Sequence, residues 1–324
     1  MRALALAGLS IAVAGCDRYW VCEADDPGRT GELPGRLSET GLFADTAARA
    51  LAPEVVPYAP RFALWSDGAE KQRWIALPPG AQIDTANMDE WSFPSGTKLW
   101  KQFSVDGVEV ETRLLEKRGP ADDDWIALAY VWQPDGLDAV AAPLGGIDVA
   151  GTDHDVPASG ECFACHGGRR SFALGFSAIQ LAAPARPGEI DLAELVAQGR
   201  LTAPAATAPV VPGDATQVAA LGYLHANCSH CHNQARPEHR GARCFDPKKR
   251  YDFTLAVGSL ASVEDTPTYR TVVGKAIEPG DPDGSEVVSL MGQRGFLDQM
   301  PPLATEKVDT TAVALIRAWI EEMR

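Results

Sequence analysis

Two copies of the frame Cys-x-x-Cys-His constrain this chain more than any other feature of its sequence. The first copy runs from Cys162 to His166 and the second from Cys228 to His232. Two thiols one helical turn apart can add to the two vinyl groups of a haem, and the adjacent imidazole can ligate the iron. Zinc sites or a thioredoxin-like dithiol would need paired ligand sets or a βαβ setting, and the sequence indicates neither. The two frames therefore predict two covalently bound haem c groups.

The segment around the second frame predicts further haem contacts. A helix capped by Asp214 is expected before Cys228, and a Met-Pro-Pro loop at Met300 precedes a final helix that carries Trp319. Gly222 on the earlier helix is expected to admit the Trp319 indole. This order resembles the class I cytochrome c family from about residue 214 to the end of the chain.

The class I resemblance implies that the Met300 thioether is the second axial ligand of the iron bound by His232. A thioether ligand raises the reduction potential and fills the sixth position, which suits electron transfer and disfavours substrate binding at that iron.

The first frame has no comparable methionine loop, because no Met lies between His166 and Cys228. The sixth ligand of its iron is left open by the sequence, and an unfilled position is one alternative. The candidate ligands are Met88, Met291, Met323, His154, His225, His230 and His239.

The start of the chain indicates export. An apolar run from Ala3 to Gly15 follows Arg2 and ends in Val-Ala-Gly before Cys16, which resembles a bacterial lipobox. Cys16 is therefore the expected lipidation site, placing the protein on the periplasmic side of a bacterial membrane. Asp17 resembles an inner-membrane retention signal and slightly favours that membrane. No run of about 18 apolar residues predicts a membrane-spanning helix.

Two of the seven cysteines remain after lipidation and haem attachment are assigned. An oxidising compartment favours a disulfide between Cys22 and Cys244, with two unpaired thiols as the alternative.

Residues 39–150 alternate apolar and polar side chains between turn dipeptides, which is typical of antiparallel strands. A hairpin is expected at Asp106-Gly107, after which Glu109, Glu111 and Arg113 would share a solvated face. Six tryptophans are expected to fill the core of this region: Trp65, Trp74, Trp91, Trp100, Trp125 and Trp132. The linker that follows is rich in Ala and Pro, with one short helix expected over 190–198.

The predicted fold class is α+β, with an N-terminal antiparallel β-rich, sandwich-like domain followed by an all-α cytochrome c domain. The expected divisions are a lipoprotein signal peptide over 1–15, an extended leader over 16–38, a β-rich domain over 39–155, the first haem-attachment segment over 156–181, an Ala/Pro-rich linker over 182–213 and a class I cytochrome c domain over 214–324.

Several stretches together resemble the di-haem c-type cytochrome family of bacterial exported (lipo)proteins. They are Leu37–Phe43, Leu64–Trp74, Trp91–Phe103, Glu111–Leu115, Gly175–Leu181 and Met300–Leu303, with the first frame. The sequences LWSDGAEKQRW, FPSGTKLWKQF and NCSHCHN carry the resemblance most clearly. The resemblance covers nearly all of the chain beyond the signal segment. It implies haem attachment at Cys162, Cys165, Cys228 and Cys231, and iron ligation by His166, His232 and Met300. The family implies no particular substrate.

We expect from this sequence a membrane-anchored di-haem cytochrome that transfers electrons between a dehydrogenase or cytochrome and a respiratory acceptor such as a terminal oxidase, and no catalytic residue is assigned. The alternative is a haem enzyme acting on peroxide, nitrogen oxides or hydroxylamine at an open first haem. A β-rich unit before a haem frame also resembles the small β-sheet haem proteins that oxidise hydroxylamine. Binding of a carbohydrate or partner protein by the β-rich region is a third possibility.

The net charge of −15 excludes a nucleic-acid binder that relies on phosphate contacts, and it favours a basic redox partner.

Overall fold

The computed structural model describes residues 32–236, 251–295 and 299–323. Cys16, Cys22, Cys244 and His239 lie outside the described residues, so the predicted lipidation site, the predicted disulfide pair and one candidate ligand have no structural account.

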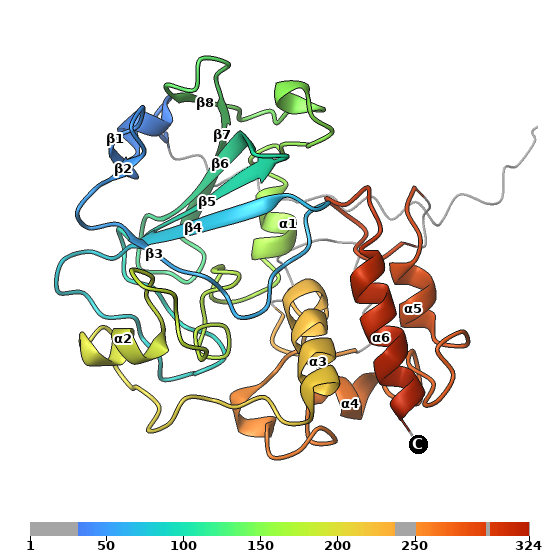
Figure 1. The fold of residues 1–324 in the computed structure, drawn as a ribbon. Helices are drawn as coiled ribbons and strands as arrows, with labels where there is room; N and C mark the ends of the chain where they lie inside the picture. The colour runs from blue at the N-terminus through green and yellow to red at the C-terminus, as the bar shows by residue number, and fades with distance from the viewer. Residues whose placement is uncertain (1–31, 237–250, 296–298, 324) are drawn as a thin grey trace, which may run out of the picture.

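The centre of the fold is a six-stranded antiparallel sheet in the order β3-β4-β5-β6-β7-β8, in which every strand pairs with its neighbour in sequence. A separate two-stranded ribbon, β1-β2, lies beside it (Figure 1). The strands are β1 (Phe43–Asp45), β2 (Ala50–Leu51), β3 (Val56–Pro57), β4 (Glu70–Ala76), β5 (Lys98–Val105), β6 (Val108–Lys117), β7 (Trp125–Trp132) and β8 (Ala139–Ala141).

The described residues also form six short α-helices, and helical residues make up 21% of the structure. They are α1 (Cys162–His166), α2 (Leu192–Ala197), α3 (Ala215–Cys228), α4 (Pro267–Val272), α5 (Glu286–Met291) and α6 (Thr310–Glu322), with single 3₁₀ turns η1 (Leu37–Glu39), η2 (Val149–Gly151) and η3 (Val257–Ser259).

The predicted fold class is wrong. Residues 214–324 do not form an all-α cytochrome c domain after a β domain, because the structure is built on an eight-strand sheet system with only short helices. Between α3 and α6 the helices α4 and α5 have six residues each. Gly274 and Gly280 adopt left-handed backbone conformations there, and prolines remove backbone donors, so longer helices cannot form. The β-rich part also contains one large sheet rather than two facing sheets.

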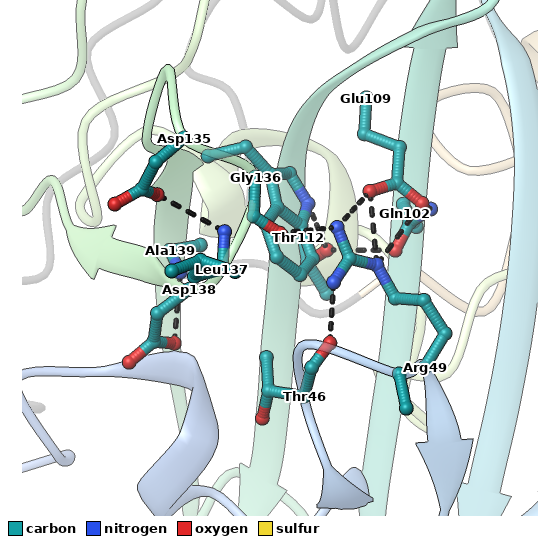
Figure 2. A network of polar contacts seen from close by, with 12 residues as sticks. Thr46, Arg49, Gln102, Glu109, Thr112, Asp135, Gly136, Leu137, Asp138 and Ala139 are labelled. Atoms are coloured by element: carbon teal, nitrogen blue, oxygen red, sulfur yellow. Dashed lines mark hydrogen bonds and ion pairs between the residues drawn. The ribbon is translucent and has the colours of Figure 1, made fainter.

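The hairpin between β5 and β6 turns at Asp106-Gly107 as predicted, with both residues at positive φ. The prediction that Glu109 and Glu111 share a solvated face is wrong. A β-bulge between Phe103 and Ser104 puts Glu109 opposite Ser104 and Glu111 opposite Phe103, so the alternation shifts by one residue. Glu109 therefore joins Arg49 and Gln102 on one face (Figure 2), whereas Glu111 is buried at the other.

Both faces of the sheet are covered. One face, with Trp74, Trp100 and Trp132, packs against Leu37 and the β1-β2 ribbon. The other face carries Ile75, Leu99 and Leu115, which are buried with α2 and with residues on both sides of the first haem frame. Five of the six tryptophans are buried as predicted, but Trp65 is only half-buried and its indole N–H donates to the Lys307 carbonyl at 3.0 Å.

The C-terminal helices gather around α3, which packs against α6 (Figure 1). A Cβ atom at Gly222 of α3 would lie 2.1 Å from the Phe62 ring, so Gly222 admits Phe62 rather than the predicted Trp319. Trp319 is buried in the apolar cluster of the C-terminal helices, against which Phe62 also packs. The segment that carries Phe62 thereby joins the sheet to the helix that ends in the second haem frame.

Candidate haem-attachment site

The first frame forms α1 itself, which ends at His166 with Gly167 as its C-cap. Cys162 and Cys165 are half-buried and unpaired. The His166 ring places Nδ1 2.6 Å from the Phe172 carbonyl oxygen. Because a carbonyl can only accept, Nδ1 must carry the proton, and Nε2 keeps its lone pair. An imidazole held in this tautomer is suited to ligate a metal through Nε2.

The second frame continues from the end of α3. Asp214 and Gln217 form a reciprocal capping box at the start of this helix. The amide of His232 donates to the Cys228 carbonyl at 2.9 Å, so the frame completes one further helical turn. The His232 ring lies edge-on to Phe253, with 5.7 Å between ring centroids. Both frames therefore present two thiols and one imidazole on a single turn.

The protonation of these groups argues against a redox-active dithiol. Burial raises the pKa of Cys162 to about 11 and that of Cys228 to about 12, whereas reactive dithiols have a lowered thiol pKa. Burial, together with the Lys101 charge, lowers the pKa of His166 to about 3. No group of three His, Cys, Asp or Glu side chains in the described part of the chain converges as a bare-ion site would require.

The two frames, distant in sequence, pack directly on each other. A Cβ atom at Gly168 would lie 1.9 Å from the His230 carbonyl oxygen, so the two backbones touch at a position where only glycine fits. The Asn233 side-chain amide donates to the Gly168 carbonyl at 3.1 Å and to the Ser229 carbonyl at 2.7 Å. This buried asparagine fixes the second frame against the first.

A cavity of about 240 Å³ is lined by residues that follow the first frame and by residues of the second frame. Met88, His225 and His230, three of the candidate ligands for the first iron, line it together with Arg169. Arg169 forms a buried ion pair with Glu90 at 2.7 Å. His225 accepts a hydrogen bond at Nδ1 from the Leu255 amide at 3.1 Å, and burial lowers the pKa of His225 to about 3.

The other candidate ligands have different surroundings. His154 Nε2 lies 2.7 Å from a Glu111 carboxylate oxygen, and this contact engages the nitrogen that would otherwise reach a metal. Met291 is buried in the C-terminal apolar cluster, and Met323 packs against that cluster.

Met300 lies in the loop between α5 and α6. Its amide donates to the Leu290 carbonyl at 2.9 Å, and its own carbonyl accepts from Arg294 at 3.4 Å. The axial role that the resemblance implies for Met300 stays a prediction.

Sequence reasoning missed a row of basic side chains beside the first frame. Arg73 on β4, Lys101 on β5 and Arg113 on β6 are direct neighbours in the sheet register. They lie on the same sheet face as Ile75, Leu99 and Leu115, each of which is two residues away on the same strand. The sequence did contain a signal for this row. In LWSDGAEKQRW and FPSGTKLWKQF, Arg73 and Lys101 stand at positions where the strand alternation would place an apolar side chain.

Comparison with known proteins identifies no relative: no family model matches the chain, and neither a curated protein nor a solved structure matches it. Within the described residues, no helix has the length and apolar character needed to cross a membrane.

Proposed function

We propose that this chain is an exported, lipid-anchored di-haem c-type cytochrome that transfers electrons between a dehydrogenase or another cytochrome and a respiratory acceptor. Export and anchoring rest on the lipobox-like run that ends at Cys16. Haem binding rests on the two Cys-x-x-Cys-His frames.

The observation that carries this proposal is the packing of the two frames against each other. Gly168 contacts the His230 backbone, and Asn233 bonds to both segments. Two redox groups attached to segments in direct contact are close neighbours, and a close pair favours passage of an electron from one to the other. A chain with independent, separate redox functions would not need this contact.

The residues present fit a haem at each frame. The tautomer of His166, set by the Phe172 carbonyl, leaves the Nε2 lone pair available to a ligand bond, and the four cysteines of the frames form no disulfide. A haem bound at each frame would supply a one-electron iron couple. The chain then contributes fixed imidazoles, thioether attachment and a rigid contact between the two segments.

The first test counts haems in protein matured in a cell that attaches haem c. We expect two haems per chain by pyridine haemochrome and by intact mass. Cys162→Ser with Cys165→Ser should lose one haem, and Cys228→Ser with Cys231→Ser should lose the other. Absence of covalent haem in the wild-type protein would contradict the proposal.

The second test adds carbon monoxide to the dithionite-reduced protein. An unchanged spectrum is expected for electron transfer, because both irons would then hold two protein ligands. A shift of about half of the haem absorbance would contradict that expectation and favour the alternative, a haem enzyme with an open first iron.

A further inference from the structure

The basic row formed by Arg73, Lys101 and Arg113 is an unusual element of a sheet. Like charges directly opposite one another on neighbouring strands are destabilising. Here three basic side chains stand side by side across β4, β5 and β6. Lys71, two residues before Arg73, adds a fourth basic side chain to the same face.

The charges of this row are only partly balanced. Arg113 is balanced by Glu111, whose carboxylate oxygens lie 2.9 and 3.0 Å from Arg113 Nε. Arg73 is only 8% exposed, and Lys101 is half-buried. Among the described residues, no hydrogen bond or ion pair holds the Arg73 guanidinium or the Lys101 ammonium, and their nitrogen atoms keep some contact with solvent. A cation held largely away from water is costly unless an anion balances it, so this arrangement favours an anionic ligand.

The pKa values of the neighbouring lysines reflect the same excess of positive charge. Burial, with repulsion from Arg73 and Arg113, lowers the pKa of Lys71 to about 7. The same causes hold the pKa of Lys101 well below its ordinary value. A carboxylate placed among these groups would reverse the repulsion and restore their charge.

The row faces both the first haem frame and a large cavity. Lys101 and Arg113 are close enough to the first frame for their charges to act on the pKa of His166 and of Cys162, respectively. At the other end, Arg73 and Lys71 line a cavity of about 1050 Å³, which is large enough for a cofactor edge or a small ligand. The row therefore leads from the thiols of the first frame to open space.

We propose that Arg73, Lys101 and Arg113 form a carboxylate-binding site beside the first haem. The carboxylate comes either from the propionates of that haem or from a small carboxylate that enters the large cavity. The inference rests on the proposed function, since both sources are defined relative to a haem at Cys162 and Cys165. Arginine and lysine in a partly desolvated row bind carboxylates through charge-assisted hydrogen bonds.

The test uses the holoprotein with Lys101→Met, after pyridine haemochrome has established two haems per chain in the variant and the wild type. Counting haems first distinguishes failure of the proposed function from failure of the carboxylate site. If the wild type carries no haem, the proposed function is wrong, and the carboxylate site is not yet tested by that result. Arg73→Met, at the cavity end of the row, is the second variant if Lys101→Met does not mature. Lys98→Gln is the matched control, because Lys98 lies on the same strand and bonds to the Thr40 carbonyl on the opposite face.

Potentiometric titration between about pH 5 and pH 8 is the first readout. If the haem propionates occupy the site, the wild-type potentials are flat with pH, because paired carboxylates stay ionised. Lys101→Met should then lower the reduction equilibrium constant of one haem about tenfold, equivalent to about 59 mV for one electron. The potential of that haem should also acquire a pH-dependent slope as its carboxylate pKa rises.

Titration of the oxidised holoprotein with acetate is the second readout and distinguishes the sources. A saturable spectral change in the wild type that is lost in Lys101→Met and kept in Lys98→Gln identifies an external carboxylate. No response to acetate, together with the potential change, identifies the propionates. If Lys101→Met and Arg73→Met leave the potentials, their pH dependence and the acetate response equal to those of Lys98→Gln, the carboxylate site does not exist.

Discussion

Glu111 links Arg113 of the sheet to His154, which precedes the first frame in the chain. Its side chain is 0% exposed and bonds both to Arg113 and to His154. Burial alone would raise the pKa of Glu111, but the charges and hydrogen bonds of Arg113 and His154 outweigh burial and lower it. The carboxylate is therefore ionised in the folded protein and neutralises one member of the basic row.

Replacing Glu111 by Gln should destabilise the protein by about 3–5 kcal/mol, because it leaves Arg113 without its buried counter-ion. Urea unfolding followed by circular dichroism measures this loss. Glu109→Gln is the control, since Glu109 lies on the other face with 30% exposure and pairs with Arg49 (Figure 2). That change should cost about 1 kcal/mol or less. Equal losses for the two variants would contradict the special role of Glu111.

The pH dependence of stability provides an independent check on the same residue. Since the folded-state pKa of Glu111 is depressed, its contribution is present above the unfolded-state pKa of about 4.3 and is lost as pH falls through the folded-state value. Wild-type stability should therefore fall more steeply in acid than that of Glu111→Gln. Parallel curves of stability against pH for the two proteins would show that Arg113 and His154 do not lower the pKa of Glu111.

At the scale of elements, the contact between Gly168, after α1, and His230, after α3, holds the two frames together. Gly168→Ala would place a methyl group 1.9 Å from the His230 carbonyl oxygen, which is backbone and cannot rotate away. We expect a loss of about 1–3 kcal/mol from overpacking and a shift in at least one haem potential as the frames separate. Gly160→Ala, shortly before α1, is the matched control because nothing lies within 4 Å of its Cβ position. Unchanged stability and potentials in Gly168→Ala would show that the frames are not held by this contact.

The same scale shows what could be predicted from the sequence and why. The Asp106-Gly107 hairpin was predictable because two adjacent residues that tolerate positive φ specify a two-residue turn. The opposite placement of Glu109 and Glu111 was not, because a bulge is a property of two paired strands rather than of one. The contact of Gly168 with His230 depends on tertiary packing between distant segments, and no local pattern encodes it.

At the scale of the molecule, the segment 60–68 connects the sheet to the C-terminal helices. Phe62 fills the space at Gly222, and the Trp65 amide donates to the Asn227 side chain at 2.7 Å. The Asp67 carboxylate accepts from the amides of Glu306 and Lys307, each at 2.9 Å. These contacts explain why the C-terminal part is not a free-standing cytochrome c domain: it is built against residues that belong to the sheet region.

The last prediction concerns the charge of the whole molecule. With a net charge of −15, the protein should attract cationic redox reagents and repel anionic ones. Oxidation of the reduced protein by hexaammineruthenium(III) should slow as ionic strength rises, and oxidation by ferricyanide should accelerate, since the Debye length falls to about 10 Å at 0.1 M salt. A neutral quinone serves as the control and should show no dependence. Stopped-flow rates at several salt concentrations measure all three. If the oxidation rates with the two charged reagents depend on ionic strength in the same way, the site of electron exchange lies outside the field of the acidic residues. A basic docking partner would then have no electrostatic advantage.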